Sequence, residues 1–171
     1  MKKVIVIVLA VLAVLGLYLA LNNNSVDPST QGTISTLNAA EIPEASGFVN
    51  DHADILNRET RQYLEDKLKN QKPEIAVLTV NSTGNLDIEQ YGIKVAEKWK
   101  VGDADKDDGV IFIVDMGAHK VRIEVGYGSE GKIPDAKAGR ILDENVLPYF
   151  SVGDWDGGIV NGVDRIIKEL K

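Results

Sequence analysis

Four aspartates within six residues form the densest group of side chains that could do chemistry in this chain: Asp103, Asp105, Asp107 and Asp108. Carboxylates crowded into a short loop repel one another unless water or a cation separates them. Oxygen ligands of this kind are those that calcium and magnesium prefer. The loop therefore has two interpretations, a divalent cation site and a solvated acidic loop without a ligand.

The sequence near the four aspartates partly matches two known motifs, the EF-hand loop and the GxGxxG dinucleotide fingerprint. In both cases the required residues or the required strand are at the wrong position. Counting Asp103 as the first residue of an EF-hand loop, the required glycine falls on Asp108 and the required glutamate falls on Val114. The GxGxxG pattern at residues 126–131 follows a later strand, whereas a dinucleotide fingerprint follows the first strand of a βαβ unit. These glycines are better explained by a need for tight backbone geometry.

The acidic loop and the glycine-rich loop are separated by a predicted β-hairpin. Residues 110–114 are continuously apolar, and residues 121–125 alternate between apolar and charged side chains. Two antiparallel strands place the start of the first beside the end of the second, so we expect the two loops to meet. The metal ligands predicted there are Asp107, Asp108, Glu130 and Asp135, with helix capping as the alternative role of Asp135.

Asp51 is a further predicted ligand, although the sequence alone assigns it to neither end of the sheet. It precedes His52, one of only two histidines, so a histidine-rich metal site and an HExxH protease motif are excluded. The chain has no cysteine, which excludes disulfides and thiolate metal sites. Any metal site must therefore use oxygen ligands, and calcium is the cofactor that we expect.

The charge distribution argues against a nucleic-acid partner. All 26 acidic residues follow residue 21, with 17 of the 19 basic residues, so this part of the chain carries a formal charge of −9. Nucleic-acid binding depends on basic residues that neutralise phosphates.

The N-terminal segment, residues 1–21, has the pattern of a membrane anchor or an export signal. Lys2 and Lys3 precede an uncharged run of 18 residues at positions 4–21. At about 1.5 Å per residue, such a helix can just cross a hydrocarbon core of about 30 Å. Either interpretation leaves the lysines in the cytoplasm and places the rest of the chain outside it, anchored to the membrane or secreted after cleavage.

Residues 22–46 have the composition of a flexible linker, and residues 47–171 that of a folded domain. Strands at 75–80 and 110–114, joined by a helix from Asp87 to Trp99, predict a parallel βαβ unit. Amphipathic helices are expected at 58–70, 135–146 and 155–170. The predicted fold class is α/β, a three-layer α/β/α sandwich around a small mixed sheet of three to four strands.

The order and spacing of several segments resemble the TPM domain family over residues 47–170. These segments are 48–51, Ile88 to Gly102, 108–110, 121–128, Glu130-Gly131, Asp135, Arg140 and Gly153-Asp154. The resemblance implies an α/β/α sandwich that is exported and tethered to a membrane. It also implies one of several roles: photosystem repair and weak acid phosphatase activity in plant thylakoids, an accessory role at an animal receptor channel, and calcium binding in bacteria.

Three functional hypotheses follow. The first is a membrane-tethered module outside the cytoplasm that binds a divalent cation and assists an unidentified membrane or envelope protein. The second is a metal-dependent acid phosphatase that uses the same carboxylates. The third is an interaction domain without a metal.

Overall fold

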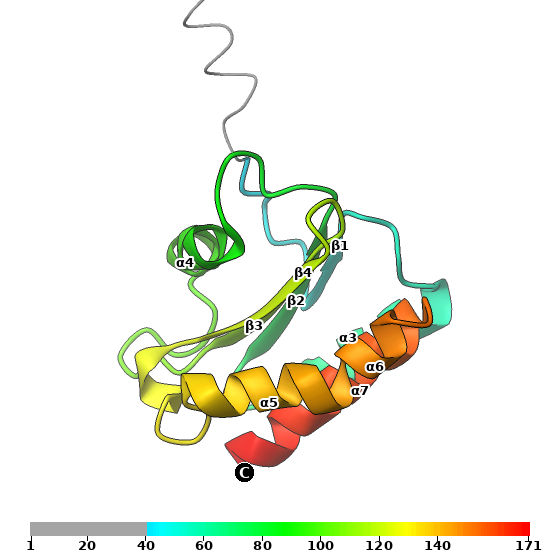
Figure 1. Cartoon of the computed structure of the whole chain (residues 1–171). Helices are drawn as coiled ribbons and strands as arrows, with labels where there is room; N and C mark the ends of the chain where they lie inside the picture. Colours follow the sequence, from blue (N-terminus) through cyan, green and yellow to red (C-terminus); the bar gives the residue numbers. More distant parts are fainter. Residues whose placement is uncertain (1–40) are drawn as a thin grey trace, which may run out of the picture. The chain divides into compact units, whose positions relative to one another are not determined.

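The computed structural model describes residues 41–171, so the predicted anchor and most of the predicted linker lie outside the described residues. Four strands form one mixed sheet in the order β1-β2-β3-β4 (Figure 1). They are β1 (Val49–Asp51), β2 (Ile75–Val80), β3 (Val110–Asp115) and β4 (Lys120–Val125). The predicted α/β class is confirmed, with a sheet of four strands.

The two central strands are the continuously apolar runs of the sequence. Every residue of β2 and β3 is buried, as expected for strands that are covered on both faces. β1, β2 and β3 are parallel, and β4 is antiparallel to β3, with Val110 opposite Val125. The predicted βαβ unit and the predicted hairpin are both confirmed.

Within residues 41–171, one helix, α4 (Ile88–Trp99), lies against one face of the sheet (Figure 1). Asp87 caps its N-terminus by accepting a hydrogen bond from the Gln90 backbone N–H at 2.7 Å. Ile88, Tyr91 and Val95 recur at helical spacing and are buried against β2 and β3.

The opposite face carries the larger apolar core, against which the remaining helices pack. They are α3 (Arg58–Leu68), α5 (Asp135–Asn145), the short α6 (Leu147–Phe150) and α7 (Trp155–Leu170). Asn57 and Asp154 cap α3 and α7, each by accepting a backbone hydrogen bond at 2.8 Å. Phe112 of β3 packs closely against α7, where a Cβ added to Gly162 would lie 2.7 Å from its ring.

Residues 41–44 lie across α4, although the sequence places them in the linker. The side chains of Tyr91, Lys98 and Trp99 donate hydrogen bonds to three consecutive backbone carbonyls of this segment, at 3.1, 2.6 and 2.8 Å. These residues accordingly belong to the same compact unit as the domain. None of the helices within residues 41–171 is both long and apolar enough to span a bilayer.

Tyr91 makes stability depend on pH in the alkaline range. Burial, and then the negative charges of Asp115 and Glu41, raise the pKa of Tyr91 to about 12. An unfolded tyrosine ionises near pH 10, so the native state holds the proton more tightly. This contribution is complete below about pH 10 and is lost as pH rises toward about 12. We expect urea unfolding free energies to fall more steeply over this range in the wild type than in Tyr91→Phe. Equal slopes for the two proteins would contradict the assignment of this pH dependence to Tyr91.

Candidate functional site

The acidic loop and the glycine-rich loop meet at one end of the sheet, as the hairpin predicts. The Gly126 backbone N–H donates to the Gly109 carbonyl at 2.8 Å, and the Gly128 N–H donates to the Asp107 carbonyl at 2.8 Å. The Ser129 hydroxyl adds a hydrogen bond to the Asp108 carbonyl at 2.7 Å. The contact between the loops is therefore made mainly by backbone groups.

Two glycines of the GxGxxG pattern permit this close contact. A Cβ added to Gly126 would lie 2.3 Å from the Asp107 carbonyl oxygen, and one added to Gly128 would lie 2.1 Å from that of Lys106. The third, Gly131, has no atom within 4 Å of such a Cβ. The pattern serves loop packing, which confirms the prediction of tight backbone geometry.

A groove with a volume of about 360 Å³ opens beside these loops, between α4 and β4. Four carboxylate side chains line it, and within residues 41–171 no lysine or arginine does. We call it the acidic groove, and its lining residues are Ile93, Ala96, Glu97, Asp107, Glu124, Val125, Gly126, Tyr127 and Glu130.

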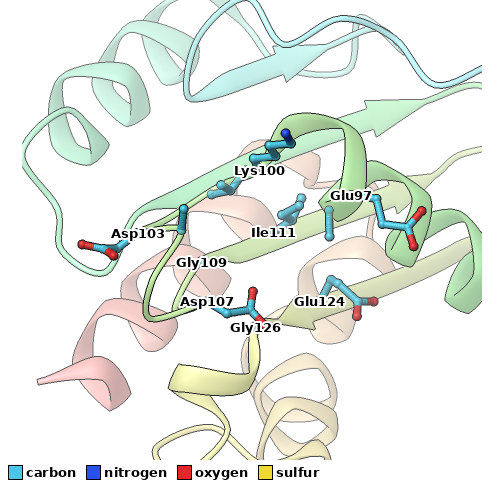
Figure 2. A pocket seen from close by; sticks show the side chains of 11 residues that line it. Glu97, Lys100, Asp103, Asp107, Gly109, Ile111, Glu124 and Gly126 are labelled. Carbon is cyan, nitrogen blue, oxygen red and sulfur yellow. The ribbon is translucent and has the colours of Figure 1, made fainter.

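A second hollow of about 350 Å³ continues from the acidic groove toward the end of α4. It shares Glu97, Asp107 and Glu124 with the groove and adds Lys100 and Asp103. Figure 2 shows Glu97 and Glu124 reaching this region from α4 and β4, while the Asp103 carboxylate points away. Three carboxylates thus lie where the two hollows overlap, and one of them, Glu124, is paired with Arg122.

Asp107 is the predicted ligand that lies at the centre of this region. Its backbone is left-handed, with φ of 48°, and its carboxylate accepts a hydrogen bond from the Tyr127 N–H at 3.3 Å. Glu130, a second predicted ligand, lines the same groove. The structure therefore brings these two predicted residues together.

Asp108 closes the acidic loop and does not line the groove. Its carboxylate accepts a hydrogen bond from the Asp103 N–H at 3.0 Å. The Asp105 N–H, which donates to the Asp103 carboxylate, and the Lys106 ammonium together hold the pKa of Asp103 below its ordinary value. These contacts stabilise the loop that positions Asp107.

Asp135 is the first residue of α5 and also lies outside the lining of the groove. Pro134 occupies the N-cap position, and no side chain caps this helix. The capping role considered for Asp135 is therefore wrong, because the helix begins at Asp135 itself. A carboxylate in the first turn still interacts favourably with the helix dipole.

Asp51 lies at the opposite end of the sheet from the acidic groove. It pairs in register with Thr79, which in turn lies beside Val114, whereas the acidic loop precedes Val110. Its carboxylate accepts hydrogen bonds from the Thr79 hydroxyl at 2.5 Å and from the backbone N–H groups of the segment that leads into α3. Its side chain is only 1% exposed, so the structure assigns it a structural role.

A buried carboxylate in β3, Asp115, also has a structural role. One of its oxygens accepts from the Gly117 and Ala118 N–H groups at 3.0 and 3.1 Å, and the other accepts from the Thr83 hydroxyl at 2.9 Å. The carboxyl ends of parallel strands often carry ligand sites in α/β proteins. Here the carboxylates at those ends are occupied by internal hydrogen bonds.

The carboxylates of the acidic groove do not form a ready-made metal cage. Within residues 41–171, no three Asp, Glu or His side chains come close enough together to hold a metal ion. A cation in the groove would therefore need water or carbonyl oxygens to complete its coordination, and calcium sites in proteins commonly include both.

Sequence reasoning missed Glu97 and Glu124, which contribute half of the four carboxylates of the groove. Glu124 is on the polar side of an alternating strand, and its carboxylate pairs with Arg122 at 2.6 Å. Glu97 is on the exposed side of α4. Their positions in polar faces were visible in the sequence, but their shared location depends on how α4 packs on the sheet.

Comparison with known proteins identifies a family. The TPM domain family model matches residues 49–169. The chain is similar to the N-terminal domain of a protein from P. gingivalis, solved by NMR, with 30% identity and a TM-score of 0.66 over 72% of this chain and 81% of that one. No match was found among curated proteins.

Two further NMR structures share the fold. The BA42 protein from Bizionia argentinensis has 19% identity and a TM-score of 0.58, over 67% of this chain and 81% of that one. The N-terminal domain of the cg2496 protein from Corynebacterium glutamicum has 16% identity and a TM-score of 0.56, over 77% and 86% of the two chains.

Proposed function

Because the chain belongs to the TPM domain family, we propose that it is a binding module held outside the cytoplasm by its N-terminal segment. In this proposal the acidic groove binds a divalent cation, calcium, and the domain assists a membrane or envelope protein complex. Residues 4–21 provide the membrane attachment, with Lys2 and Lys3 on the cytoplasmic side.

The observation that carries the proposal is the composition of the acidic groove. Glu97, Asp107, Glu124 and Glu130 line it, and no basic side chain from the described part of the chain lines it with them. A concave surface with an excess of negative charge raises the local concentration of cations. The same composition argues against the phosphatase hypothesis, because Arg122, the basic residue in contact with a groove carboxylate, is already paired with Glu124 at 2.6 Å.

Calcium suits this groove because its coordination is flexible. It takes six to eight oxygens, and waters and carbonyl groups commonly complete the set. Asp107 and Glu130 are the predicted ligands that lie in the groove, with Glu97 and Glu124 added by the structure. Asp108 contributes indirectly, because its hydrogen bond closes the loop that carries Asp107.

The test is a calcium titration of the full chain in detergent micelles, followed by backbone NMR. We expect shifts at residues 103–109 and 124–130 and a Kd on the order of 10⁻⁴–10⁻³ M, the range of extracellular calcium modules. Asp107→Asn should weaken binding about tenfold, because it removes one charged ligand from the centre of the groove.

The matched control is Asp66→Asn, which removes one charge from the exposed surface of α3. It should leave the calcium affinity unchanged. No response up to millimolar calcium would refute cation binding, and equal weakening by both variants would show that calcium responds only to the overall charge.

A further inference from the structure

The two edges of the sheet differ in how their backbone groups are satisfied. β1, at one edge, has three residues, and the Glu65 carboxylate covers it by accepting hydrogen bonds from the Val49 and Phe48 N–H groups at 2.8 and 3.2 Å. β4, at the other edge, has six residues. An edge strand of this length is a template for a further strand unless it is blocked.

The register of the hairpin shows which groups of β4 are free. Bonded and non-bonded pairs alternate along an antiparallel ladder, and Gly126 bonds to Gly109. The N–H and C=O groups of Val121, Ile123 and Val125 therefore point away from β3. Within residues 41–171, no other group forms a hydrogen bond with these three residues on that side.

The surroundings of this edge favour a basic, partly apolar ligand. The acidic groove runs beside the last residues of β4 and is lined by four carboxylates, of which Glu124 is paired with Arg122 and the other three are Glu97, Asp107 and Glu130. Two large apolar side chains of the groove are exposed to solvent, Ile93 by 51% and Tyr127 by 79%. Figure 2 shows Glu124 at this end of β4, with Glu97 of α4 on the same side.

We propose that the unpaired edge of β4 binds an extended segment of a partner protein as a fifth strand. Its backbone would bond to Val121, Ile123 and Val125, and alternate lysine or arginine side chains would enter the acidic groove. Strand addition of this kind takes its affinity from main-chain hydrogen bonds and its specificity from the pockets for alternate side chains. The inference rests on the groove being a binding surface, but not on its binding calcium.

A second copy of this chain is a poorer occupant of the same edge. Two β4 strands paired about a twofold axis would bring two acidic grooves together, each with four carboxylates. Like charges brought face to face oppose association. The charge of the groove therefore favours a partner of opposite charge.

The proposal can be tested with two capped hexapeptides of alternating lysine and valine. One is unmodified, and the other carries N-methyl groups on alternate residues, which keep the charge but remove one row of backbone donors. For the full chain in detergent micelles, we expect the unmodified peptide to protect the Val121, Ile123 and Val125 amides from hydrogen exchange. The affinity of the methylated peptide should be lower by about tenfold or more.

Changes in the groove test the charge requirement without altering the strand. Glu97→Lys combined with Glu130→Lys should weaken binding of the unmodified peptide about tenfold at low salt. Charge reversal at Asp66, on the surface of α3, should have no such effect.

Three other results would overturn the proposal. Equal binding of both peptides would show that the peptides bind through charge alone and not as a strand. Protection of the β4 amides without peptide at high protein concentration would indicate that two copies of the chain pair through β4. No binding of either peptide would exclude strand addition for this class of sequence. A missing calcium response combined with peptide protection would refute only the cation site.

Discussion

Replacing Asp51 with asparagine should lower the free energy of unfolding by about 3 kcal/mol. The carboxylate accepts hydrogen bonds from the Thr79 hydroxyl and from the Ile55 and Leu56 N–H groups, and its side chain is 1% exposed. An asparagine side chain has one acceptor oxygen in place of two. Its NH₂ group would face N–H or O–H groups that also donate hydrogen bonds. Urea denaturation of the full chain in micelles, followed by circular dichroism, measures the change.

The matched control is Asp54→Asn, because both aspartates lie 3.6 Å from the same Arg61 guanidinium. The Asp54 side chain is exposed, so its loss should cost less than about 0.5 kcal/mol. Asparagine also tolerates the left-handed backbone at this position, where φ is 52°. A similar small cost for both variants would contradict the structural role of Asp51.

Gly109→Ala should destabilise the domain by about 3 kcal/mol, because overpacking here forces two backbone segments apart. The added Cβ would lie 1.9 Å from the Val101 carbonyl oxygen, an atom of the backbone that no side-chain rotation can move away. Gly109 also accepts the Gly126 hydrogen bond that joins the two loops. We expect both a lower unfolding free energy and NMR shifts throughout residues 101–109.

Gly131→Ala is the control for the preceding substitution. It adds the same methyl group in the adjoining loop, where nothing lies within 4 Å of the new Cβ. Its unfolding free energy should stay within about 0.5 kcal/mol of the wild type. If Gly109→Ala were equally neutral, the close approach of Val101 to Gly109 would be refuted.

The sequence predicted the elements whose pattern repeats along the chain. Apolar runs at 75–80 and 110–114 indicated the central strands, and the helices expected from 58, 87 and 155 begin within one residue of those positions. The contact between the acidic and glycine-rich loops was also predictable. It requires only that an antiparallel hairpin join the strands between them.

Other features depended on contacts between segments far apart in the chain. β1 has only three residues, too few to show a period, so the position of Asp51 depended on the pairing of β1 with β2. Asp108 was predicted beside Asp107, yet its side chain turns back to Asp103.

The sequence by itself determined that this is an α/β domain with an acidic loop beside a glycine-rich loop. The tertiary structure decided which carboxylates share a groove, because Glu97 and Glu124 meet only through the packing of α4 on β4. Periodicity shows which face of an element is polar, but not which other polar face it meets. The position of β4 at the edge of the sheet has the same origin, since strand order is set by pairing between segments and not within them.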